Sequence, residues 1–209
     1  MDQVKRLYSS LVAVAIGYGL IVITIWSPRA TQRTLFWVDV AFFLTAAILQ
    51  ISASGFELPR LGLSLVIAGL GLLAAAAILY LGSIFGTLHP LFGRPSPLLH
   101  AGTYLIWAVV QQWIQQSFFF VRLEHFLARG WFASFATASL FALAHLPNPI
   151  LTPVTFVGGF VLSEIFRRYR TVIPLGIAHG AVGLAIALAV PDALNHHMRV
   201  GLGYLRWHG

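Results

Sequence analysis

One apolar run limits the folds open to this chain more than any other feature. Residues 61–82 read LGLSLVIAGLGLLAAAAILYLG and contain no charged side chain. A helix of about twenty apolar residues can cross the hydrocarbon core of a bilayer. The rest of the chain is similar in character, because 58% of its 209 residues are hydrophobic and only 9% are charged. A soluble domain cannot bury that much apolar surface, so the sequence predicts an integral membrane protein.

Turn-forming residues divide the chain into about seven apolar segments, which predicts an all-α polytopic membrane protein. The predicted transmembrane helices lie at approximately 7–26, 35–54, 61–86, 99–121, 131–146, 153–169 and 172–190. The fifth segment is short, and short membrane segments usually pack inside protein or border a cavity. The Gly- and Ala-rich third segment is expected to allow close helix packing.

These segments predict three parts of the chain. Residues 1–98 form the N-terminal transmembrane helices, residues 99–190 form the core helices, and residues 191–209 form an amphipathic tail.

The charges indicate membrane partners and an orientation. The net charge of +7 is explained by arginines in loops that face anionic lipid headgroups, so membrane lipid is an expected partner and nucleic acid is not. The excess of basic residues on one side of a seven-helix arrangement predicts a cytoplasmic N-terminus, and the expected location is a bacterial inner membrane. The chain has no cysteine, which excludes disulfides and thiol catalysis.

Four glutamines interrupt the fourth apolar segment, in WAVVQQWIQQSFFF. At helical spacing, Gln111, Gln112, Gln115 and Gln116 occupy one arc about 140° wide. Burying amides in hydrocarbon is costly, so this polar face should point into the helix bundle. Two interpretations remain open. The amides either connect helices by hydrogen bonds or form the wall of an active or ligand-binding site.

Two histidines lie in neighbouring apolar segments. Spacing of four residues in FALAH places the ring of Phe141 next to the imidazole of His145, and His179 lies well inside the last segment. Imidazole is well suited to proton transfer near neutral pH, and it also binds metals. A divalent metal at His145 and His179 is one option, but no third ligand is evident, so no metal site is assigned.

Glu164 is the remaining acidic candidate. It precedes Arg168 by four residues, which is the spacing of a simple ion pair along a helix. It is otherwise a candidate to contact substrate or to assist His145.

The region from about 105 to 187 resembles the CPBP family of intramembrane proteases, also called the CAAX-protease or Abi family. That family has the motifs Glu-Glu-x-x-x-Arg, Phe-x-x-x-His and His-x-x-x-Asn. SLFALAHLP keeps the second motif as Phe141 and His145, and the third keeps His179 but has Gly183 in place of asparagine. The first motif corresponds to Gln111, Gln112 and Gln116, so both acids and the arginine are replaced by amides.

The resemblance implies a CPBP-like bundle and a hydrophobic or prenylated substrate. It also implies catalytic positions at Gln111, Gln112, His145 and His179, whereas Gln115, Gln116, Phe141 and Glu164 are expected to contact substrate. A carboxamide cannot act as the general base that a carboxylate supplies.

Three functions therefore remain open. The favoured one is a membrane enzyme, either hydrolase-like or isoprenoid- or lipid-modifying, with a repurposed pocket for a lipid, isoprenoid or prenylated substrate. The alternatives are an endopeptidase with His145 as base and a non-catalytic binding or assembly protein.

Overall fold

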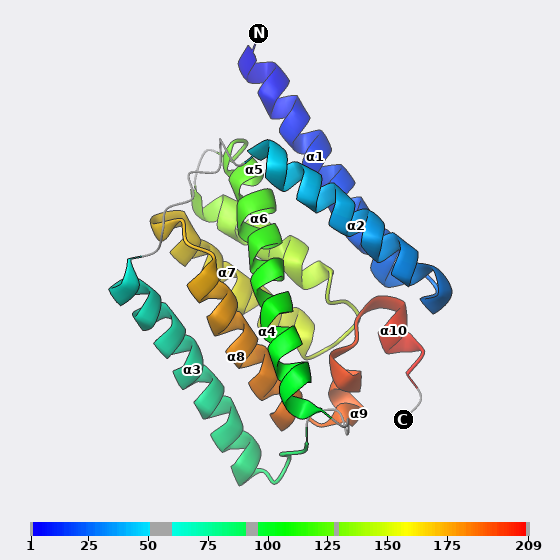
Figure 1. Cartoon of the computed structure of the whole chain (residues 1–209), viewed down its shortest axis with the longest axis vertical. Coiled ribbons are helices and arrows are strands. Elements are labelled where there is room, and N and C mark those ends of the chain that lie inside the picture. The colour runs from blue at the N-terminus through cyan, green and yellow to red at the C-terminus, as the bar shows by residue number, and fades with distance from the viewer. Residues whose placement is uncertain (1, 51–59, 91–95, 128–129, 208–209) are drawn as a thin grey trace.

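The computed structural model describes residues 2–50, 60–90, 96–127 and 130–207, and all regular structure within these ranges is helical (Figure 1). The helices before residue 130 are α1 (Asp2–Trp26), α2 (Arg29–Gln50), α3 (Leu61–Ile84), α4 (Pro97–Trp113), the π-helix η1 (Ile114–Phe120) and α5 (Val121–Glu124). The later ones are α6 (Gly130–Leu143), α7 (Leu151–Tyr169), α8 (Ile173–Ala189), α9 (Asp192–Asn195), the 3₁₀ turn η2 (His196–Met198) and α10 (Gly201–Leu205).

Each of the seven predicted segments is helical over most of its length. The fourth is longer than predicted, because α4 continues without a break through η1 and α5 to Glu124. The fifth is shorter, because α6 ends at Leu143 and His145 lies in the turn that follows.

Among the described residues, fewer helices are long and apolar enough to cross a membrane than the seven that the sequence predicts. Tyr8–Trp26 and Leu61–Ile84 are each long and apolar enough to cross a bilayer. The helix Ile173–Ala189 and the segment Asp192–Met198 form a third candidate if they are one span bent by 119°. An integral membrane protein therefore follows from the described helices, whereas seven crossings stays a prediction.

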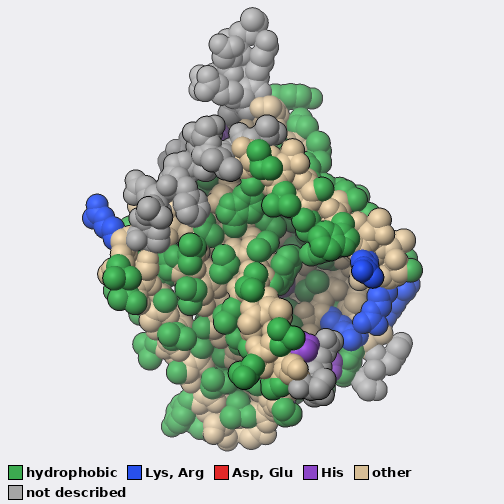
Figure 2. Space-filling model, in the orientation of Figure 1, with side chains coloured by type: hydrophobic (Ala, Val, Ile, Leu, Met, Phe, Trp, Pro, Cys, Tyr) green, Lys and Arg blue, Asp and Glu red, His purple; other side chains and the backbone are tan. Residues whose placement is uncertain are grey.

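The surface exposes many large apolar side chains, as a surface that contacts lipid does. Large apolar side chains are exposed along the outer face of α3, among them Leu61, Leu65 and Leu73, which are 64–75% exposed. Apolar side chains also cover most of the face seen in Figure 2, where no acidic group is visible. Soluble monomers rarely expose apolar patches of this extent.

Small residues bring α3, α8 and α4 into close contact, and the three helices lie side by side in Figure 1. Gly71 of α3 lies directly against the backbone of Ala178 on α8. On the other side of α8, a side chain added at Gly176 would meet Val109 of α4 at 2.6 Å. Close backbone approach of this kind is how helices pack in lipid, and it confirms the predicted packing role of the third segment.

Aromatic side chains hold the α1–α2 hairpin against the core. Phe118 of η1 is fully buried, and its ring lies edge-on to Phe43 of α2 at 5.0 Å between centroids. Gly17 of α1 provides space for the same ring, since a Cβ there would be 2.8 Å from Phe118. The hairpin is therefore anchored at η1.

The C-terminal tail folds back onto the bundle. The buried amide of Asn148 donates hydrogen bonds to the carbonyl oxygens of Asn195 and Arg199, at 2.9 and 3.1 Å. The backbone N–H of Gly201 donates to the carbonyl of Leu146 at 2.7 Å. These bonds join the tail to the turn that carries His145.

Candidate functional site

A large cavity of about 1130 Å³ lies between the α1–α2 hairpin and the core helices. Its lining comes from α1, α2, α3, α4, η1, α6, α7 and α8, together with Met198 and Val200 of the tail. Ligand-binding pockets commonly measure roughly 300–1,000 Å³. The volume is therefore sufficient for a large ligand, and most lining residues are apolar.

The π-helix η1 shapes the polar part of the cavity. Its hydrogen bonds span five residues instead of four, and Gln115 and Gln116 lie within it. Gln111, Gln112 and Gln115 line the cavity, whereas Gln116 does not. The polar face points into the bundle as predicted, because Gln112, Gln115 and Gln116 are all buried. The predicted contact of Gln116 with substrate stays a prediction. π-helical turns are frequent at functional sites.

The glutamines form a hydrogen-bond chain whose direction can be assigned. Gln115 Nε2 donates to the carbonyl of Gly159 at 3.4 Å, which turns Gln115 Oε1 toward Gln112. Gln112 Nε2 then donates to that oxygen at 2.9 Å and also lies 3.0 Å from His179 Nδ1. Gln116, which does not line the cavity, donates through Nε2 to Gln112 Oε1 at 3.1 Å. Reversing the Gln112 amide would bring two carbonyl oxygens together, so its N–H₂ group faces His179.

This chain determines the tautomer of His179. An amide N–H₂ group can only donate, so His179 Nδ1 accepts and carries no proton. A neutral imidazole has one N–H, and in His179 it is on Nε2. His179 is therefore a hydrogen-bond donor through the ring nitrogen that Gln112 does not contact.

His145 has the opposite tautomer. Its Nδ1 lies 2.7 Å from the backbone carbonyl of Phe141, and a carbonyl oxygen can only accept. The proton is therefore on Nδ1, and Nε2 has a free lone pair. This is the arrangement of a neutral general base.

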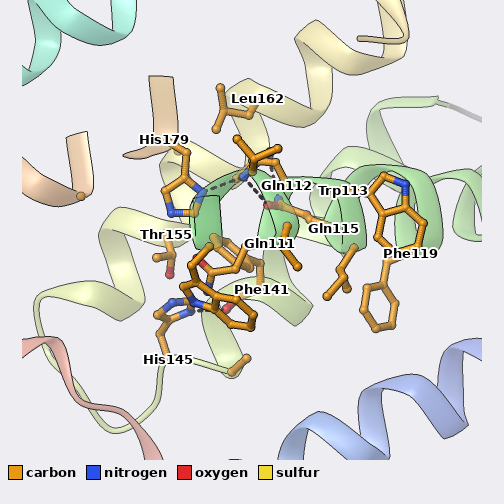
Figure 3. A pocket seen from close by; sticks show the side chains of 18 of the residues that line it. Gln111, Gln112, Trp113, Gln115, Phe119, Phe141, His145, Thr155, Leu162 and His179 are labelled. Carbon is orange, nitrogen blue, oxygen red and sulfur yellow. Dashed lines mark hydrogen bonds between the residues drawn. The ribbon is translucent and has the colours of Figure 1, made fainter. Parts of the chain in front are cut away.

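Both histidines border the ring of Phe141. The ring centroid of Phe141 lies 4.7 Å from His145 and 5.6 Å from His179, with near-perpendicular planes in each case. Figure 3 shows His179 beside Gln112, and His145 on the far side of Phe141. The predicted i, i+4 contact of Phe141 with His145 is confirmed. The structure also brings His179 from a different helix into the same cavity.

A metal would need more ligands than these two histidines. No group of three His, Asp or Glu side chains suited to a metal ion occurs within the described ranges. A zinc site normally has at least three protein ligands. No chemical step is therefore assigned to a metal here.

Glu164 lies away from the site, which corrects its predicted role. Its carboxylate accepts a hydrogen bond of 2.6 Å from Ser134 and pairs with Arg167 at 2.7 Å. The predicted partner, Arg168, is not the one used, because the i, i+3 position allows Arg167 to bind both carboxylate oxygens. Glu164 is not among the cavity-lining residues, so it connects α7 to α6 instead of contacting a substrate.

Asp39 and Tyr104 line the cavity but were not predicted as site residues. Asp39 of α2 is the only acidic residue that lines the cavity in the described part of the chain, and Tyr104 of α4 places its hydroxyl against Gly183. An acid at this depth in an apolar segment was a usable signal, since intramembrane charges are rare. Nothing in the sequence indicated that Tyr104 and Gly183 would meet.

The fold and this cavity define a helical membrane protein with a polar site inside the bundle. Residues 93–185 match the family model described as type II CAAX prenyl endopeptidase Rce1-like. This segment of 93 of the 209 residues is similar to the CPBP, or CAAX-protease, family of intramembrane proteases. Neither the curated proteins nor the solved structures give a significant match.

Proposed function

We propose that this protein is a membrane hydrolase that cleaves a carbonyl-containing bond in a substrate with a prenyl or other long hydrocarbon chain. One observation carries the proposal. Two neutral histidines of opposite tautomer border the same cavity, so that one offers a lone pair and the other offers an N–H group. The match to a family of CAAX prenyl endopeptidases supports a hydrolytic reaction.

The proposed reaction needs no carboxylate. His145 Nε2 accepts a proton from water as the water oxygen attacks the carbonyl carbon, and His179 Nε2–H donates a hydrogen bond to the carbonyl oxygen as it becomes negative. The His145 imidazolium then returns the proton to the leaving group when the bond breaks. The sum is addition of one water molecule across the bond.

The glutamines have a supporting role in this scheme. Gln112 holds His179 in the tautomer that donates into the cavity, and Gln115 and Gln116 orient Gln112. Polar groups that orient a catalytic histidine typically have large effects on rate, because the wrong tautomer cannot perform its step. Replacing the acids by amides therefore changes which group acts as base.

The remainder of the cavity suits an apolar chain. Its lining on the hairpin side includes Ile21, Val40, Phe43 and Leu44, and no Lys or Arg lines it within the described ranges. Removing hydrocarbon from water is favourable by about 25 cal/mol per Å². A prenyl or acyl chain would bind there with its polar end at the histidines.

A non-catalytic binding role is the second candidate. It is favoured by the hydrogen bonds that the amides already make within the protein. Gln112 is fully buried, and both of its amide protons have acceptors. A pocket whose central amides are already hydrogen-bonded can hold a ligand without reacting with it.

Hydrolysis of a fluorogenic farnesylated peptide by purified protein in lipid nanodiscs tests the proposal. We expect wild-type protein to cleave the peptide and His145→Ala to lose about 10²- to 10⁴-fold in kcat, the usual contribution of a general base. The exposed His125 provides the control, because His125→Ala should leave the rate unchanged. Equal background rates for wild type and His145→Ala, together with retained peptide binding, would support the binding role instead.

A further inference from the structure

The hydroxyl of Tyr104 lies in an unexpected place for a polar group. A Cβ atom built on Gly183 would overlap the Tyr104 hydroxyl oxygen and lie 2.8 Å from Cζ. The tyrosine ring therefore points from α4 directly at the backbone of α8, and it does so at a residue that lines the cavity. Any side chain at position 183 would displace this hydroxyl.

Packing alone does not explain the hydroxyl. Gly176, Gly180 and Gly183 follow one another along α8 where it meets α4. The first two lie against the apolar atoms of Val109 and Leu105. An apolar side chain at position 104 would fill the third contact equally well. A hydroxyl placed in such an interface costs free energy unless it makes a hydrogen bond.

The hydroxyl has an unused hydrogen-bonding capacity. Tyr104 makes no hydrogen bond to any other described residue. Its hydroxyl oxygen is not one of the fully buried polar atoms that lack a partner, and the residue lines the cavity. Gly183 follows His179 by four residues, so the two lie one turn apart on the same face of α8. The hydroxyl thus borders the cavity next to the histidine that offers an N–H group.

We infer that the Tyr104 hydroxyl is a second hydrogen-bond donor for the substrate's carbonyl oxygen, beside His179 Nε2–H. The inference rests on the proposed hydrolysis. As the carbonyl carbon becomes tetrahedral, its oxygen gains negative charge, and two neutral donors stabilise that charge without any cation in the site. Tyr104 keeps its proton throughout and takes part in no bond cleavage.

Tyr104→Phe is the direct test, because it removes the oxygen and keeps the ring against Gly183. With the farnesylated peptide we expect kcat to fall about 10²- to 10³-fold, the usual effect of losing one such donor, with little change in KM. The thermal midpoint should stay at the wild-type value. The exposed Tyr80 on α3 supplies the control, since Tyr80→Phe should change none of these quantities.

A binding measurement separates this inference from the proposed function. The probes are a farnesyl trifluoromethyl ketone, whose hydrate resembles the tetrahedral state, and the matched farnesyl chain without a ketone. Wild type and Tyr80→Phe should bind the ketone at least about tenfold more tightly than the chain, and Tyr104→Phe should lose this preference.

The outcomes are distinct. If wild type cleaves no peptide but still shows a ketone preference that depends on Tyr104, hydrolysis fails and the donor role stands. If Tyr104→Phe keeps the wild-type preference, or if wild type has none, the donor role is wrong. Unchanged kcat in Tyr104→Phe would also overturn it.

Discussion

The two walls of the cavity differ in chemistry and in how they are held. The wall from α4, η1, α8 and α6 with the turn after it carries the connected glutamines and both histidines. Close glycine contacts fix the backbone of α8 against α4. The opposite wall, from α1 and α2, is lined mainly by aliphatic and aromatic side chains and is anchored at Phe118. Asp39 and Thr24 are exceptions in it.

This difference separates two tasks. Groups that must meet a reacting atom need fixed positions, because small displacements reduce the rate strongly. Groups that hold a hydrocarbon chain need only apolar surface, and many arrangements provide it. We therefore expect substitutions in the polar wall to change kcat, and substitutions in the apolar wall to change KM.

After His145, the largest effect is expected at His179. His179→Ala removes the N–H donor, and kcat for the farnesylated peptide should fall about 10²- to 10³-fold. Because His145 and His179 act in the same step, the double variant should be only slightly slower than the more impaired single variant. Steady-state rates of the two single variants and the double variant give the coupling energy between His145 and His179. Fully additive losses would show that the two histidines work independently.

Gln112→Leu should have a smaller effect than loss of His145, His179 or the Tyr104 hydroxyl. It removes the amide donor to His179 Nδ1 and keeps most of the side-chain volume, so the fixed tautomer is lost. We expect kcat to fall about 10- to 100-fold, as found when groups that orient a functional histidine are removed. Nitrogen-15 NMR of the imidazole rings should show His179 changing from its Nε2–H form to a mixture, with His145 unaltered. An unchanged His179 spectrum would contradict the assigned hydrogen-bond chain.

Gly183→Ala tests the packing of the polar wall. The added methyl group would overlap the Tyr104 hydroxyl, so we expect a loss of about 1–3 kcal/mol in unfolding free energy, typical of overpacking. Thermal denaturation in detergent measures it. Gly102→Ala is the matched control, because a Cβ there meets nothing within 4 Å. Combining Gly183→Ala with Tyr104→Ala should recover stability if the two residues contact each other as described.

The smallest effect is expected in the apolar wall. Leu44 lines the cavity but is 57% exposed, so Leu44→Ala removes only part of a buried contact. KM for the farnesylated peptide should rise about two- to tenfold with kcat unchanged, because substrate and transition state lose the same contact. A fall in kcat equal to that of Gln112→Leu would remove the distinction between the walls.

Some features of this protein follow from local sequence alone. Apolar runs of about twenty residues predict the seven main helices, since the need to satisfy backbone hydrogen bonds in lipid leaves few alternatives. The contact of Phe141 with His145 follows from helical spacing, and the motif residues around them indicate the family.

Only the tertiary structure decided the chemistry of the site. The tautomers of His145 and His179 depend on partners at specific distances, and for His179 that partner is 67 residues away. Gln116 is buried but does not line the cavity, and Arg167, not Arg168, is the partner of Glu164. Tyr104 and Gly183 meet only because α4 packs on α8. Periodicity predicts which residues share a helix face, whereas the direction of a hydrogen bond depends on what the neighbouring helix presents to it.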